Sequence, residues 1–143
     1  MELRIPRTAV ADIEAHALES LPEECCGFLL GREDDPVRVV TEARRATNAE
    51  PEMRHVRYTI EPREVLAVER EFRGTDSRLL GFYHSHPENP AAPSAHDAAR
   101  AWPWYVYAIL AVRGRKPGEF RAWTFDEDAA AFHEATVRMA WAP

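Results

Sequence analysis

The chain has 143 residues, the usual size of one domain built around one hydrophobic core, so we expect a single domain over residues 1–143 and exclude a two-domain enzyme. Hydrophobic residues make up 45% and charged residues 29%, as in ordinary globular proteins, which excludes a disordered or fibrous chain. The 18 Lys and Arg against 24 Asp and Glu give a net charge of −6. This charge disfavours nucleic acids and anionic membranes as partners, because both attract a basic face.

The N-terminal residues and the apolar segments predict a cytoplasmic protein. Residues 1–7 carry several charges and no apolar run follows them, so they do not form a secretory signal. The longest apolar stretch, residues 102–112, contains Pro103 and is far shorter than the roughly 20 residues of a membrane-spanning helix. Cys25 and Cys26 are adjacent and cannot form an ordinary disulfide, which agrees with a reducing compartment.

The predicted elements alternate between helices and strands without a regular β-α-β rhythm. Apolar residues three or four positions apart indicate helices, and short apolar runs closed by turn residues indicate strands. In chain order, we expect strands at 3–6, 25–31, 37–47, 58–60, 79–84, 105–112 and 120–125, and helices at 8–21, 62–74, 94–102 and 126–141. Thr8 and Ser94 are the expected helix caps, and residues 116–118 the expected turn between the last two strands. The resulting class is a mixed α/β fold with a sheet flanked by helices.

The segment from His84 to Asp97 contains a candidate metal site. Side chains repeat every two residues along a strand, so His84 and His86 project from the same face and can bind one ion together. The loop at 87–93 has three prolines and is long enough to bring Asp97 back to that ion. Catalytic zinc takes three protein ligands and leaves one position for water, so this set suits zinc.

Other interpretations of the same residues stay open. The pattern from Ser94 to Asp97 is also typical of a helix start, in which Ser94 caps the helix and Asp97 lies in its first turn. Two histidines and one carboxylate also describe the facial triad of non-haem iron enzymes. A zinc nucleobase deaminase is excluded, because its signature needs cysteines that are absent after position 26. Three further histidines are expected to have structural roles, namely His16, His55 and His133. The same is expected of the tryptophans, Trp102, Trp104, Trp123 and Trp141.

A water molecule activated by a metal needs a proton acceptor. Glu23 and Glu24 precede the apolar strand that starts at Cys25, and a carboxylate there could accept the proton if it lies near the centre of the sheet. The local pattern alone does not decide between the two glutamates, nor does it distinguish either from a solvated surface residue.

The spacing of His84, His86, Ser94 and Asp97 is similar to the JAMM motif of the MPN+ (JAB1/MPN/Mov34) metalloproteases. The segment Glu24-Cys-Cys-Gly-Phe-Leu-Leu-Gly31 resembles the upstream element of that family. The resemblance implies a curved mixed sheet between helices, with a cytidine-deaminase-like architecture, as one MPN/JAMM domain. It also implies that His84, His86 and Asp97 bind Zn²⁺, that Glu24 rather than Glu23 is the general acid/base, and that Ser94 helps to hold the oxyanion or the attacking water.

The resemblance to small prokaryote-type members implies a substrate. It points to hydrolysis of an amide or isopeptide bond at the C-terminal tail of a ubiquitin-like or sulfur-carrier protein. An extended tail could lie along a sheet edge, and the loop at 48–57 and the segment near Trp102 are the candidate lining of its groove. The alternative function is a non-catalytic MPN-type scaffold or interaction module. The sequence does not indicate the oligomeric state.

Overall fold

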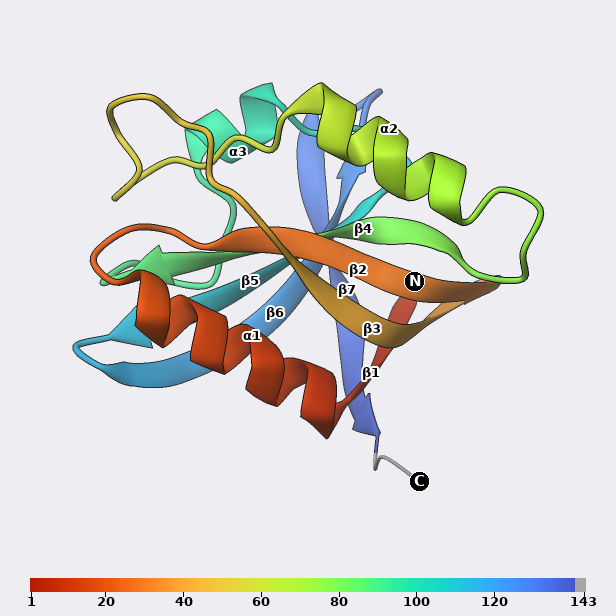
Figure 1. Ribbon diagram of the computed structural model, residues 1–143, viewed down its shortest axis with the longest axis horizontal. Helices are drawn as coiled ribbons and strands as arrows, with labels where there is room; N and C mark the ends of the chain where they lie inside the picture. The colour runs from red at the N-terminus through yellow and green to blue at the C-terminus, as the bar shows by residue number, and fades with distance from the viewer. Residues whose placement is uncertain (141–143) are drawn as a thin grey trace.

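The computed structural model describes residues 1–140, which form a mixed β-sheet with helices on both of its faces (Figure 1). The helices are α1 (Arg7–Ser20), α2 (Pro62–Glu71) and α3 (Ala95–Ala99). The strands are β1 (Glu2–Pro6), β2 (Cys26–Asp34), β3 (Val37–Ala46), β4 (Arg78–Pro87), β5 (Val106–Arg113), β6 (Lys116–Asp126) and β7 (Ala131–Ala140). The predicted sheet between helices is therefore confirmed.

The sheet closes on itself, which the sequence analysis did not predict. Across residues 1–140 the strands pair in the order β1-β3-β2-β4-β5-β6-β7, and β1 also pairs with β7. β1 runs parallel to β3 and β7, β4 runs parallel to β5, and the other neighbouring strands are antiparallel. The pairing of β3 with β1 covers only residues 37–39, so the C-terminal part of β3 pairs with β2 alone.

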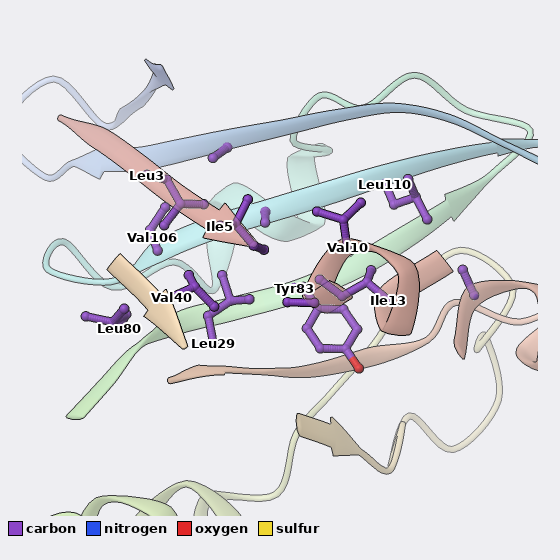
Figure 2. Close-up of a cluster of buried hydrophobic side chains, with 14 of the residues drawn as sticks. Leu3, Ile5, Val10, Ile13, Leu29, Val40, Leu80, Tyr83, Val106 and Leu110 are labelled. Atoms are coloured by element: carbon purple, nitrogen blue, oxygen red, sulfur yellow. The ribbon is translucent and has the colours of Figure 1, made fainter. Parts of the chain in front are cut away.

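Two apolar cores lie on opposite faces of the sheet. The first core packs the inward stripe of α1, including Val10 and Ile13, against Leu29 and Tyr83 (Figure 2). The second core lies beneath α2 and includes Phe82. Tyr83 and Phe82 are neighbours on β4 and point to opposite faces, so His84 and His86 project from the same face as Phe82. That is the face covered by α2 and α3 (Figure 1).

The predicted C-terminal helix at 126–141 is wrong, because residues 131–140 form β7. Phe132 packs on the second core, whereas Ala135 lies in the first core. Two residues three positions apart therefore bury on opposite faces of one strand, and this spacing resembles the period of a helix. Trp141, which belonged to the prediction, lies outside the described residues.

Several smaller predictions are also wrong. Pro6, and not Thr8, occupies the N-cap position of α1, with no side-chain capping bond. Residues 58–60 form no strand, and the backbone of Thr59 bonds to Asn48 and Ala49 of the same loop. The turn between β5 and β6 falls at residues 114–115, where Gly114 adopts a φ of 60°.

Some large apolar side chains are exposed. Trp102 has 66% of its surface exposed and Leu66 on α2 has 51%. Trp104 is exposed too, and the guanidinium of Arg38 lies 4.1 Å from the centre of its ring, so a cation–π contact replaces core packing. No helix within residues 1–140 has the length and apolar character required to cross a membrane.

Candidate metal centre

The three predicted ligands converge on one point. Nε2 of His84 lies 3.0 Å from Nε2 of His86 and 3.2 Å from Oδ2 of Asp97. Nε2 of His86 lies 3.3 Å from the same oxygen. Donor atoms at zinc–ligand distances of ~2.0–2.2 Å in a tetrahedron are about 3.3–3.5 Å apart, so the three observed separations fit a zinc ion to within about 0.3 Å.

Local structure explains why these side chains meet. The strand β4 places His84 and His86 on one face, and both are almost fully buried. The loop after β4 brings the chain back to α3, where Ser94 and Asp97 form a capping box. The Ser94 backbone N–H donates to Oδ2 of Asp97 at 2.8 Å, and the Asp97 N–H donates to Oγ of Ser94 at 3.0 Å. The cap therefore orients the carboxylate toward the histidines.

The surroundings of the two histidines differ. Nδ1 of His86 donates to the carbonyl oxygen of Pro90 at 2.8 Å, so Nε2 keeps its lone pair for an ion. The ring of His84 stacks on Tyr58, with 4.4 Å between the ring centres and 27° between the planes. Nδ1 of His84 has no hydrogen-bond partner among the described residues. The stacked tyrosine restricts the orientation of the His84 ring.

The charges of the site favour a cation. Burial alone would raise the pKa of Asp97, but the two histidines and the Ser94 N–H more than offset this, so its pKa lies well below the ordinary value. Burial lowers the pKa of His84, which favours the neutral, ligating form of its imidazole. The pKa of His86 is instead raised, because contacts with Asp97, Pro90 and Glu24 outweigh its burial. A buried carboxylate beside two imidazole nitrogens is a donor set that zinc accepts.

The Glu24 carboxylate lies close to the two histidines. Glu24 is 4% exposed, and one of its carboxylate oxygens lies within 4.8 Å of a ring nitrogen of each histidine. Its Oε1 finds no hydrogen-bond partner within residues 1–140. Burial raises the pKa of Glu24 to about 8, with Asp97 adding to the effect and His86 opposing it. A carboxyl whose pKa lies near neutrality can both accept and return a proton.

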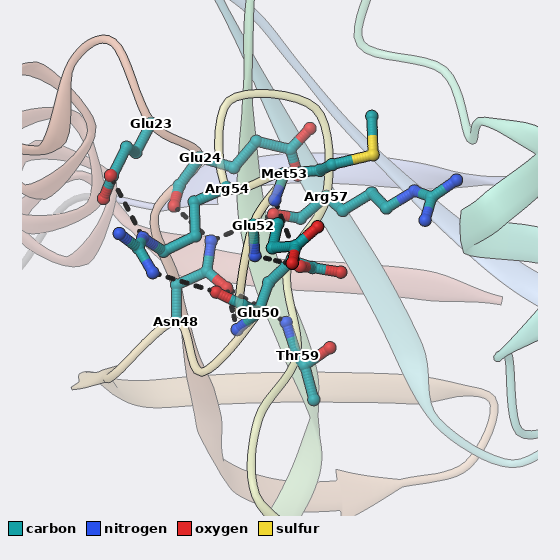
Figure 3. Close-up of polar contacts among 9 residues, drawn as sticks. All are labelled: Glu23, Glu24, Asn48, Glu50, Glu52, Met53, Arg54, Arg57 and Thr59. Carbon is teal, nitrogen blue, oxygen red and sulfur yellow. Dashed lines mark hydrogen bonds and ion pairs between the residues drawn. The ribbon is translucent and has the colours of Figure 1, made fainter.

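The neighbouring Glu23 points elsewhere. Its Oε2 pairs with Nε of Arg54 at 3.0 Å, and both of these side chains are partly exposed (Figure 3). The geometry thus separates the two glutamates that the sequence left as rivals. Ser94 lies beside Glu24 and His86 at a hollow of about 370 Å³.

A second hollow borders Asp97. It has a volume of about 110 Å³ and is lined in part by Tyr58, Arg100 and Trp102. Val56, from the loop at 48–57, lines the first hollow. The two segments nominated from the sequence therefore line two different hollows, one bordering His86 and the other bordering Asp97.

Other residues support the site from loops and from the face of the sheet opposite the histidines, and the sequence did not point to them. Ser85 lies between the two histidines in sequence, and its Oγ accepts the Cys25 N–H at 2.9 Å. Tyr58 and Asn48 contact His84 and the Glu24 backbone, respectively. The alternation of β4 could have placed Ser85 opposite the histidines, but no pattern indicated the contacts of the loop residues.

The three histidines expected to be structural, and the two cysteines, have surroundings that agree with such roles. Nδ1 of His16 lies 2.7 Å from the hydroxyl of Tyr83 inside the first core. His133 is exposed and pairs with Asp126, and His55 is exposed as well. Cys25 and Cys26 are free and buried, and burial raises the pKa of the Cys25 thiol to about 11.

Comparison with known proteins identifies relatives over nearly the whole chain. The family model for prokaryotic homologs of the JAB domain matches residues 6–126. The chain is 38% identical to the Desampylase of Haloferax volcanii over 142 residues, which cover 96% of each protein. It is 31% identical over 114 residues to a Probable TtuB-protein conjugate cleaving protease of Thermus thermophilus, covering 78% of this chain and 73% of the relative. Among solved structures, protein DSY2949 of Desulfitobacterium hafniense matches with a TM-score of 0.85 and 28% identity, covering 98% of this chain and 94% of that one.

Proposed function

Because the chain belongs to the family of prokaryotic JAB-domain homologs, we propose that it is a zinc-dependent peptidase that cleaves amide or isopeptide bonds at the C-terminal tail of a ubiquitin-like or sulfur-carrier protein. The names of the relatives support this substrate class, since one is a Desampylase and another is a protease that cleaves TtuB-protein conjugates. We treat residues 1–143 as one such domain, acting in the cytoplasm.

One observation carries the proposal most directly. Three donor atoms from His84, His86 and Asp97 lie 3.0–3.3 Å apart, with the buried carboxyl of Glu24 beside them and without a hydrogen-bond partner at Oε1. A purely structural cluster would leave the Glu24 carboxyl paired, because an unsatisfied buried polar atom is costly. The convergence supports a metal site with an acid/base group facing it.

The residues of the chain would divide the reaction between them. A bound zinc ion would lower the pKa of a coordinated water toward ~7 and polarise the scissile carbonyl. Glu24 would accept the proton of the attacking water and then deliver it to the leaving amine. The Ser94 hydroxyl hydrogen is free to donate to the developing oxyanion, because Oγ accepts from the Asp97 N–H.

The arrangement of the two hollows supports binding of an extended tail. The hollow with Val56 and Ser94 borders His86, and the hollow with Tyr58 and Trp102 borders Asp97. A chain that crosses the ligands would therefore contact both the loop at 48–57 and the segment near Trp102. Main-chain hydrogen bonds from such a tail would give affinity with little dependence on side chains.

Cleavage by the zinc-loaded protein tests the proposal. A ubiquitin-like carrier with a C-terminal extension is incubated with the wild type and with Glu24→Gln, and the products are weighed by mass spectrometry. We expect the trimmed carrier from the wild type and a rate lower by about 10²–10⁴-fold in the variant, with zinc retained, because the variant loses its proton acceptor. Equal binding of a partner by both proteins without cleavage would instead favour the scaffold. Activity that requires Fe(II) and is absent with zinc would favour the iron alternative.

A further inference from the structure

The backbone of Glu24 is held by a loop that is remote in sequence. The β2–β4 ladder begins at Cys26, so Glu24 lies outside regular strand pairing. Its N–H donates to the carbonyl oxygen of Arg54 at 2.7 Å, and its carbonyl oxygen accepts from Nδ2 of Asn48 at 3.0 Å. Both peptide groups next to the Glu24 side chain are thus set by residues 48–54 (Figure 3).

The Asn48 side chain uses its full hydrogen-bonding capacity. Nδ2 donates to the carbonyl oxygens of Glu24 and Arg57, each at 3.0 Å. Oδ1 accepts the N–H groups of Glu50 at 3.1 Å and Thr59 at 3.2 Å. A carboxamide has two donors and two acceptor lone pairs, and here all four are used (Figure 3). Asp at this position would keep both acceptor bonds and lose both donor bonds.

The bonds of Asn48 reach two segments of the chain that contact the candidate metal centre. One bond ends on Glu24, the proposed acid/base. Two others hold Arg57 and Thr59, which immediately flank Tyr58, and the ring of Tyr58 stacks on His84. Asn48 therefore links the segment that orients Glu24 to the segment that packs on a proposed zinc ligand.

We propose that Asn48 is a positioning residue of the hydrolytic site, which holds Glu24 and Tyr58 in register with His84 without touching the substrate. This inference rests on the proposed function. Misplacement of a reacting group by about 1 Å can reduce a rate by about 10²-fold. Loss of the Asn48 donors should therefore reduce kcat with little effect on KM, since Asn48 itself lines neither of the hollows that would receive the tail.

Two variants separate the two halves of the side chain. Asn48→Asp loses the bonds to Glu24 and Arg57 but keeps the bonds from Glu50 and Thr59, whereas Asn48→Ala loses all four. In the metal-free protein, we expect the Glu50 and Thr59 amides to exchange about tenfold faster in Asn48→Ala and at nearly the wild-type rate in Asn48→Asp. In the zinc-loaded protein, kcat should fall at least about tenfold in both variants, with KM within about threefold of wild type and zinc stoichiometry unchanged.

A control variant that is destabilised in the core, away from the site, distinguishes loss of positioning from general loosening of the fold. Ile5→Val trims a fully buried side chain in β1, and its melting temperature is compared with those of the Asn48 variants. The control should keep the wild-type kcat. Wild-type kcat in Asn48→Asp, or an equal loss in Ile5→Val, would overturn the inference while leaving the proposed function intact. A wild type that binds zinc and cleaves no carrier would overturn the proposed function itself.

Discussion

At the scale of single residues, Asp97 serves the helix cap and the candidate metal centre with one atom. Its Oδ2 accepts the Ser94 N–H at 2.8 Å and lies 3.2 Å and 3.3 Å from the two imidazole nitrogens. The two interpretations of the pattern at 94–97 are therefore compatible. The helix cap orients the Asp97 carboxylate, and the two histidines stabilise its ionised form although it is buried.

Substitutions at Asp97 and Ser94 should separate these two contributions. Asp97→Ala removes a proposed ligand and the capping carboxylate, and we expect its zinc affinity to fall by more than about 100-fold. Ser94→Ala removes the capping oxygen, which is also the proposed oxyanion donor, but none of the proposed ligands, so it should cost about 1 kcal/mol of stability while zinc stays bound. Metal analysis after dialysis and thermal denaturation measure both effects. Stoichiometric zinc in Asp97→Ala would show that the carboxylate is a cap and not a ligand.

At the scale of elements, the sequence predicted most strands and the geometry of the site on β4. Alternation placed His84 and His86 on one face, and that prediction needs no information from other elements. The strand β7 could not be predicted from the spacing of apolar residues, because Phe132 and Ala135 are buried on different faces of it. The contacts of Asn48 were equally hidden, since they join its side chain to the backbone of Glu24 and to the backbone of Arg57 and Thr59, later in the same loop.

The strands β2 and β3 approach each other closely beside the site, at Gly27. A Cβ at Gly27 in β2 would lie 2.2 Å from the ring of Tyr83 and 2.4 Å from the carbonyl oxygen of Arg44. Because one of these atoms is backbone, Gly27→Ala should force β2 and β3 apart and reduce the free energy of unfolding by about 2–3 kcal/mol.

Gly118→Ala in β6 is the matched control. The nearest atom to its Cβ would be the carbonyl oxygen of Ala111 at 3.3 Å, so a small adjustment can accommodate the methyl group. Denaturant titrations compare the two variants with the wild type. A Gly27→Ala protein as stable as Gly118→Ala would mean that the strands beside the site separate more easily than their packing indicates.

At the scale of the whole molecule, the fold class followed from the sequence but the closure of the sheet did not. β1 and β7 come from opposite ends of the chain, and their pairing from Glu2 to Pro6 is a long-range contact that local patterns do not encode. The link from α1 to the sheet is similar, because His16 meets Tyr83 across 67 positions of sequence. Both contacts place structural groups behind β4, on the face opposite the histidines.

The buried His16 should make the stability of the molecule depend on pH. Burial lowers its pKa to about 4, with the charge of Arg45 adding to the effect, whereas the unfolded chain keeps a value near 6.5. Between these values the unfolded state binds a proton that the folded state does not bind, so this contribution is complete above pH ~6.5 and is lost as the pH falls toward ~4.

The variant His16→Asn isolates this contribution, because its amide does not titrate. The stability advantage of the wild type over His16→Asn should shrink by about 1–2 kcal/mol between pH ~7.5 and ~4.5, after allowance for solvent screening. Denaturant titrations across that range measure the difference. A difference independent of pH would show that His16 titrates alike in the folded and unfolded states.

In the proposed site, one zinc ion is held jointly by the end of β4 and the start of α3, next to Glu24. Anomalous X-ray diffraction at the zinc edge, from crystals of the zinc-loaded protein, would locate this ion. We expect one peak ~2.0–2.2 Å from Nε2 of His84, Nε2 of His86 and Oδ2 of Asp97, with Glu24 outside bonding distance. A peak elsewhere, or one bonded to Glu24 in place of Asp97, would contradict it.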